Sequence, residues 1–165
     1  LVGSEMCIRD RLMTDPDDPY FLELKGQILL ESGQPNEALV PLRKATELTG
    51  YQPLIATLFG HALIATEDPQ HFKEAETVLR NAAARDRENP FTWYQLGTIY
   101  AANGDMPRAR LASAEQQSLS GQMDAALMNA QAAEAGLKQG TPDWLRAQDI
   151  EMEARGALER DKKRR

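Results

Sequence analysis

The sequence is poor in the residue types that form catalytic and covalent sites. Its 165 residues include one cysteine, Cys7, and two histidines, His61 and His71. A single cysteine excludes a disulfide within the chain. The zinc-protease pattern H-E-x-x-H, paired C-x-x-C cysteines, the P-loop and the pattern G-x-G-x-x-G are all absent from the sequence. We therefore expect this chain to contain no catalytic residue, no metal ligand and no cofactor site.

Long apolar runs and an excess of positive charge are also missing. No stretch approaches 18 consecutive apolar residues, so we expect no membrane insertion. The formal net charge of −6 disfavours nucleic acid as a partner. The basic run at 162–165 fits a helix C-terminus, where cations are favourable, better than it fits an anion-binding site. Sustained alternation of apolar and polar residues is absent, so we expect no strand.

Glycines recur with a period close to 34 residues. Gly26, Gly60 and Gly97 lie 34 and 37 residues apart, and a proline stands seven residues before each of them. In the first and third repeats a second glycine follows seven residues later, and an alanine follows five residues after that. A missing side chain lets two helices approach closely. The period therefore predicts stacked antiparallel helix pairs, in which each glycine faces an alanine of the paired helix.

The third repeat carries a family resemblance. The W, L, G, Y, G and A positions of the tetratricopeptide repeat (TPR) are occupied by Trp93, Leu96, Gly97, Tyr100, Gly104 and Ala109. The resemblance covers residues 19–140. It implies an all-α, right-handed superhelical solenoid of antiparallel helix pairs, with about three TPRs, a degenerate pair and a capping helix. It also implies a protein or peptide partner, bound in the concave groove.

Capping residues and prolines predict where the helices begin. Asp18, Asp68, Asn89 and Thr141 each precede a proline, which suits the first helical position. Gly33, Gly104 and Gly140 suit left-handed helix ends. The helix around Leu111 is expected to close the third repeat and to open the degenerate fourth. The predicted helices are 19–32, 36–48, 53–66, 70–84, 90–103, 106–119, 122–138 and 142–160.

The two ends of the chain are assigned separately from the repeats. The chain begins at Leu1 without a secretory signal pattern, so we expect it to be a fragment. Residues 1–11 resemble a translated sequencing adaptor, and a genuine disordered tail is the alternative. The predicted organisation is a disordered or artefactual segment at 1–18, a TPR solenoid at 19–140, and a capping helix with a basic tail at 141–165.

The first helix of each repeat lines the groove of TPR proteins, and this resemblance gives the candidate partner-binding residues. They form a mixed polar and aromatic surface: Tyr20, Glu23, Gln27, Glu31, Thr57, His61, Phe91, Tyr94 and Thr98. Aromatic rings would anchor a partner and polar groups would set its register. The alternative for Tyr20 and Phe91 is packing between neighbouring repeats. Glu23 occupies a position where co-chaperone TPR domains hold a C-terminal carboxylate, so we predict no such clamp.

A second resemblance concerns the parent protein. The segments DPDDPYFLELKGQILLESGQPNEAL and GTPDWLRAQDI resemble the C-terminal TPR region of bacterial periplasmic zinc metalloproteases of the β-barrel-assembly-enhancing type. This implies a periplasmic location, a role in outer-membrane protein quality control, and zinc only in a catalytic domain outside this chain. The alternative is a TPR scaffold from a cytoplasmic or secretion-assembly protein. An independent enzyme is disfavoured by the absent site. We also expect self-association through an apolar end near Leu22 and Leu24.

Overall fold

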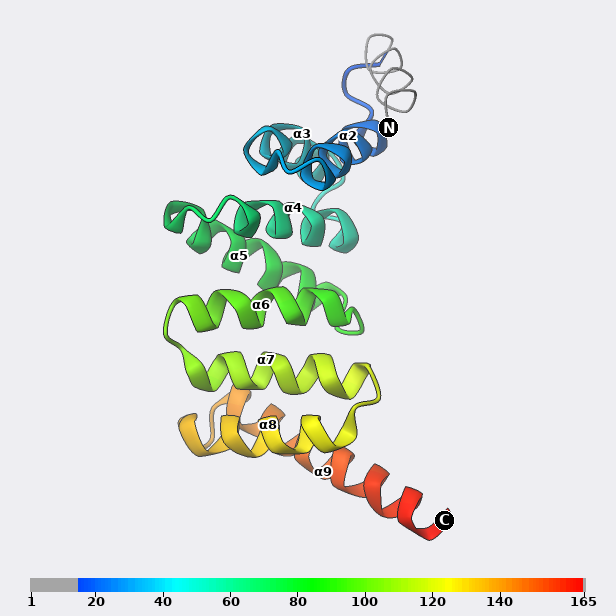
Figure 1. Cartoon of the computed structure of the whole chain (residues 1–165), viewed down its shortest axis with the longest axis vertical. Helices are drawn as coiled ribbons and strands as arrows, with labels where there is room; N and C mark the ends of the chain where they lie inside the picture. The colour runs from blue at the N-terminus through cyan, green and yellow to red at the C-terminus, as the bar shows by residue number, and fades with distance from the viewer. Residues whose placement is uncertain (1–14, 165) are drawn as a thin grey trace. The chain divides into compact units, whose positions relative to one another are not determined.

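The computed structural model describes residues 15–164, and these form eight helices without a strand (Figure 1). The predicted all-α class is confirmed, and every predicted helix is present. The bounds agree with the predicted ones to within two residues, except that the last helix continues further. The helices are α2 (Pro19–Glu31), α3 (Pro35–Leu48), α4 (Pro53–Ala65), α5 (Pro69–Arg85), α6 (Pro90–Ala102), α7 (Met106–Leu119), α8 (Met123–Gly136) and α9 (Pro142–Arg164).

The N-terminal caps are those that the sequence predicts. The Asp18 carboxylate accepts a hydrogen bond from the Tyr20 backbone N–H at 2.9 Å, and the Asn89 side chain accepts one from Phe91 at 3.0 Å. Asp68 caps α5 in the same way. Each side chain satisfies one of the donors that a helix start leaves unpaired. At the other ends, the predicted turn glycines have positive φ, for example 76° at Gly104.

The N-terminal segment is shorter in the structure than in the prediction. Residues 1–14, which include those that resemble an adaptor, lie outside the described residues. Residues 15–18 are described and belong to the folded part, since Asp17 forms an ion pair with Lys44 of α3 and Asp18 caps α2. The residues just before α2 are therefore held against α3 by this ion pair.

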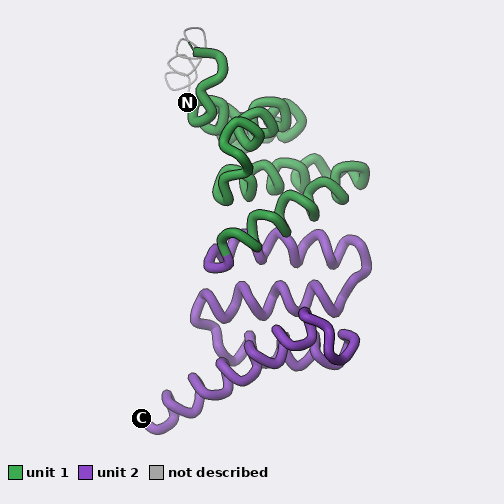
Figure 2. The backbone as a smooth tube through the Cα atoms, turned by 180° about the vertical axis from the view of Figure 1, so that it is seen from behind, with its two compact units in different colours: residues 1–86 green, residues 87–165 purple. Residues whose placement is uncertain are grey.

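The helices form two compact units, divided between Asp86 and Arg87 (Figure 2). In the first unit each helix from α2 to α5 packs against the next, and α2 also contacts α4. In the second unit each helix from α6 to α9 packs against the next, and α7 also contacts α9. The predicted solenoid, 19–140, therefore includes parts of both units, and the predicted capping helix α9 is an integral part of the second.

Close helix approach at glycine is confirmed in the first unit, although the facing residue differs from the prediction. A Cβ atom on Gly26 would lie 2.3 Å from Cγ of Leu42, and one on Gly60 would lie 2.6 Å from Cγ of Leu79. The glycines thus accommodate leucines of the paired helix, and the prediction of facing alanines is wrong there. A larger apolar side chain fills the space and contributes more buried area than alanine would.

Gly97 faces an alanine of the paired helix, as the repeat pattern predicts, but the space around it is wider than at Gly26 and Gly60. A Cβ atom at this position would lie 3.6 Å from the Cβ atom of Ala112, which is ordinary van der Waals contact. The α6–α7 contact therefore has room for a methyl group. The predicted facing alanine is confirmed here, whereas the prediction that a side chain at Gly97 would hold the two helices apart is wrong.

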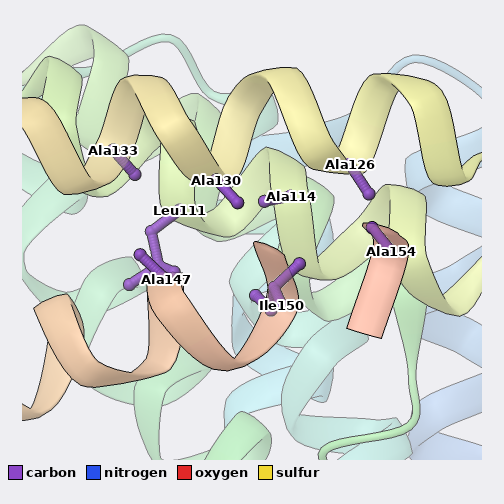
Figure 3. Close-up of a cluster of buried hydrophobic side chains, with 8 residues drawn as sticks. All are labelled: Leu111, Ala114, Ala126, Ala130, Ala133, Ala147, Ile150 and Ala154. Carbon is purple, nitrogen blue, oxygen red and sulfur yellow. The ribbon is translucent and has the colours of Figure 1, made fainter. Parts of the chain in front are cut away.

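An alanine-rich core joins the last three helices (Figure 3). The cluster includes Ala114 of α7, Ala126 and Ala130 of α8, and Ile150 of α9. Ala114 stands seven residues before Gly121, as Gly97 stands seven residues before Gly104. The helix α7 therefore completes the pair with α6 and begins the pair with α8, in agreement with the predicted double role of the helix around Leu111.

Candidate partner-binding surfaces

The four predicted positions on α2 share one side of that helix. Tyr20 is 69% exposed, Gln27 and Glu31 are exposed, and Glu23 is half-buried. The Gln27 amide donates a hydrogen bond to the Glu31 carboxylate at 2.8 Å. The other side of α2 is held in the core by Leu22, Gly26 and Ile28. The helix therefore presents an aromatic ring and two carboxylates on a rigid support.

Glu23 carries a charge that its surroundings do not compensate. Burial raises the pKa of the Glu23 carboxyl above its ordinary value of 4.5. No basic side chain pairs with it among residues 15–164. A carboxylate that is partly removed from water and has no cationic partner would be stabilised by a cation from outside.

The two predicted positions on α4 differ in exposure. His61 is half-buried, and Thr57 is only 3% exposed. Both side chains make interactions within the structure. Thr57 therefore lies outside the surface that a partner can reach in this structure, and it takes no part in the proposal below.

The predicted positions on α6 form an exposed aromatic pair with a neighbouring threonine. Phe91 and Tyr94 are 43% and 59% exposed, and their rings are stacked with centroids 6.4 Å apart and planes at 17°. Thr98 lies one turn further, and its hydroxyl donates to the Tyr94 carbonyl at 3.2 Å. The Trp93 indole donates to the Arg87 carbonyl at 2.9 Å and so fixes the start of α6. The ring pair is thereby held on an anchored helix.

The net charge is concentrated in the first unit. Residues 15–86 contain twelve acidic and six basic residues, whereas residues 87–165 contain eleven of each. The first unit therefore carries the whole formal charge of −6, and the second is formally neutral. The net charge therefore favours long-range attraction of a basic partner by the first unit, whereas in the second unit only a local cluster of carboxylates could do so.

A small cleft of about 140 Å³ lies between α6, α7 and α9, and no sequence pattern predicted it. Glu115 is buried and holds Arg146 by two hydrogen bonds of 2.6 and 2.7 Å. Arg108 pairs with Asp143 at 2.9 Å. The hydrogen bonds to these carboxylates raise the pKa of both guanidinium groups, so both cations stay protonated at ordinary pH values.

The two ion pairs of the cleft hold α9 on α7. The paired residues are more than 30 positions apart in the chain, and no local pattern marks them as partners. A cation that already has a carboxylate partner is poorly suited to bind an anionic ligand. The ion pairs of the cleft therefore serve mainly to stabilise the packing of α9 on α7.

A metal-binding cluster and a membrane-spanning helix are both absent from the described range. Residues 15–164 contain no group of three or more histidine, cysteine, aspartate or glutamate side chains with a geometry suited to a metal ion. None of the helices in the same range has the length and apolar character needed to span a bilayer.

The sequence is similar to parts of longer bacterial proteins, although no protein-family model matches it. It is 31% identical over 115 residues to the cellulose synthase operon protein C of Pseudomonas fluorescens. This aligned region covers 65% of this chain and 9% of that protein. It is 25% identical over 138 residues to the β-barrel assembly-enhancing protease of Escherichia coli, covering 84% of this chain and 28% of the protease. The chain thus spans less than a third of the length of these relatives.

The structure is similar to solved TPR proteins over most of its length. The crystal structure of TTC0263, a TPR protein of Thermus thermophilus, covers 87% of this chain and is itself 86% covered, with a TM-score of 0.51 and 22% identity. The chain has the TPR fold. A crystal structure of MamA is also similar to this chain, with a TM-score of 0.64 and 21% identity. The match covers 94% of this chain and 87% of MamA. At these sequence identities the similarity shows a shared fold and nothing about a shared function.

Proposed function

We propose that this chain is a non-catalytic module that binds a peptide or partner protein through the exposed faces of α2 and α6, the helices that correspond to those lining the concave groove of TPR proteins. The observation that carries this proposal is the exposed aromatic pair of Phe91 and Tyr94 on α6, together with the exposed ring of Tyr20 on α2. Rigid aromatic side chains bury a large area at a small entropic cost, and tyrosine is enriched at binding hot spots.

The polar residues of α2 would complement the rings. Glu23 and Glu31 offer carboxylates to basic or amide groups of the partner, and Gln27 offers both a donor and an acceptor. A partner cation next to Glu23 would remove the unfavourable effect of burial on this carboxylate. His61 of α4 and Thr98 of α6 would add polar contacts. The same carboxylates argue against a ligand that presents its own C-terminal carboxylate.

We further propose that the module is the substrate- or partner-recognition part of a periplasmic metalloprotease acting in outer-membrane protein quality control. The similarity to the β-barrel assembly-enhancing protease over 84% of this chain supports this assignment. The catalytic zinc would belong to a domain outside the chain. The second candidate is a scaffold from an unrelated assembly protein, which the similarity to cellulose synthase operon protein C favours.

Binding of an unfolded β-barrel outer-membrane protein by the full chain tests both levels of the proposal. The barrel protein carries a dye, is diluted from urea, and its fluorescence anisotropy is recorded as the chain is added. Truncating a hot-spot tyrosine costs about 2 kcal/mol or more, so we expect Tyr94→Ala to raise Kd about 30-fold or more. We expect Tyr20→Ala to weaken binding in the same direction.

Val40→Ala provides the matched control, because Val40 is 75% exposed but lies on α3 outside the proposed surface. Its Kd should equal that of the unmodified chain. An equal loss in Val40→Ala and Tyr94→Ala would contradict the proposed surface, since it would indicate general apolar adhesion. Absence of binding by the folded chain would reject the outer-membrane role and leave the scaffold alternative.

A further inference from the structure

A pocket at the turn between α8 and α9 combines an indole ring with two carboxylates. It is a surface hollow with a volume of about 560 Å³ that is largely open to solvent. Trp144 and Leu137 supply apolar surface, and Glu134 and Glu151 supply negative charge. The pocket lies entirely in the second unit and is remote in sequence from the proposed surfaces of α2 and α6.

The two carboxylates are oriented by neighbouring amides. The Gln148 side chain donates to Glu134 at 3.0 Å, and the Gln131 side chain donates to Glu151 at 3.1 Å. These hydrogen bonds join α8 to α9 and fix both acidic groups at the pocket. The hydrogen bond from the Gln131 amide is the main cause that lowers the pKa of Glu151 below its ordinary value, and the nearby charge of Arg155 acts in the same direction.

The negative charge of the pocket is only partly compensated. Arg155 pairs with Glu151 along α9, but its side chain is 57% exposed, so it can move into solvent. Glu134 has no basic partner among residues 15–164. The helix α8 also ends beside the pocket without a basic residue in its last turn. Since the C-terminus of a helix carries a partial negative charge, the helix end and both carboxylates favour a cation at the same place.

The ring of Trp144 completes a site for an organic cation. The side chain is half-buried, and its indole N–H donates to no group in the described part of the chain. The face of an indole ring attracts a cation, and a planar guanidinium can stack on the ring while its N–H groups reach two carboxylates. A metal ion fits less well, because these residues include only two carboxylates and no histidine or cysteine.

We propose that this pocket binds an arginine side chain of a protein partner. The guanidinium lies on the Trp144 ring and donates hydrogen bonds to Glu134 and Glu151, displacing Arg155 from the latter. The aliphatic part of the arginine contacts Leu137. This site is independent of the proposed surfaces of α2 and α6, and it would add a second, charge-selective contact to any partner bound there.

Nuclear magnetic resonance of the two indole N–H groups tests the proposal on the full chain. The chain has two tryptophans, so Trp144→Phe assigns both signals and Trp93 serves as an internal reference. The probe is Nα-acetyl-arginine amide, and the neutral isostere Nα-acetyl-citrulline amide is its matched control. We expect the arginine probe to shift the Trp144 signal with a Kd of about 1–10 mM, and the citrulline probe to bind at least about tenfold more weakly.

Charge-neutral variants separate this site from general charge attraction. Glu134→Gln retains an oxygen that can accept from Gln148 and should weaken binding of the arginine probe by about threefold to tenfold. Glu159→Gln removes a charge from an exposed position on α9 outside the pocket and should leave the Kd unchanged. Equal shifts with the arginine and citrulline probes, or an equal effect of the two variants, would overturn the proposal.

Discussion

Replacing two glycines of equivalent repeat positions by alanine should have opposite effects on stability. A Cβ atom on Gly26 would lie 2.3 and 2.7 Å from Cγ and Cδ2 of Leu42, which is fully buried. Overpacking a core in this way costs about 1–3 kcal/mol, and the better helix propensity of alanine returns about 1 kcal/mol. We therefore expect Gly26→Ala to lower the free energy of unfolding of the first unit by up to about 2 kcal/mol.

Gly97→Ala should instead stabilise the second unit. The new methyl group would lie 3.6 Å from the Cβ atom of Ala112, which requires no rearrangement. Only the propensity gain of about 1 kcal/mol then remains. The two variants should therefore differ by about 1–3 kcal/mol, although both replace the same residue at the same repeat position.

Urea unfolding followed by two signals measures these effects separately. Both tryptophans lie in the second unit, so their fluorescence reports on Gly97→Ala, while circular dichroism reports on all helices. We expect Gly97→Ala to raise the fluorescence midpoint and Gly26→Ala to lower the circular dichroism midpoint. The reasoning is refuted if Gly26→Ala stabilises the chain as much as Gly97→Ala, because Leu42 would then have room to move.

Three further variants test the charges and caps. Glu23→Gln should raise stability at pH 7, because burial disfavours the carboxylate. Burial raises the folded-state pKa of Glu23, so the unmodified chain gains stability as the pH falls through that pKa. The difference in urea midpoint between Glu23→Gln and the unmodified chain should therefore decrease as the pH is lowered. Arg146→Ala leaves the buried Glu115 without its cation. After allowance for the partial exposure of Arg146, it should lower the free energy of unfolding by about 1–3 kcal/mol. Arg110→Ala, at an exposed position of α7, should have little effect in the same unfolding experiment. Asn89→Ala should cost about 1 kcal/mol by removing the cap of α6, and faster amide hydrogen exchange at Phe91 and Thr92 should accompany it; unchanged exchange would contradict the capping role.

The helix boundaries could be predicted because their causes are local. A capping side chain, the proline after it and the glycine at the other end lie within the helix or beside it. The pair Asp18 and Pro19 at the start of α2, and Gly104 after α6, show this most simply. The repeat period then predicted the fold class, because a repeat of about 34 residues indicates a recurring helix pair whichever side chains are in contact.

The facing residues could not be predicted in the same way. Whether Gly26 meets Ala38 or Leu42 depends on the axial shift and crossing angle of two helices, and a change of one turn exchanges the partners. The same applies to Glu115 and Arg146, which meet only because α9 crosses α7. Thr57 illustrates the limit for the candidate surface, since a position on the expected side of a helix is buried in the structure.

The double role of α7 has a consequence for the length of a bound segment. Because α7 both completes one helix pair and begins the next, α8 makes no contact with α6 in the second unit, and the neighbour of α7 across the pair is α9. A partner bound to the exposed face of α6, as proposed above, would therefore meet no further helix equivalent to α6 in that unit. The double role of α7 would thus limit how far along the second unit an extended polypeptide could bind.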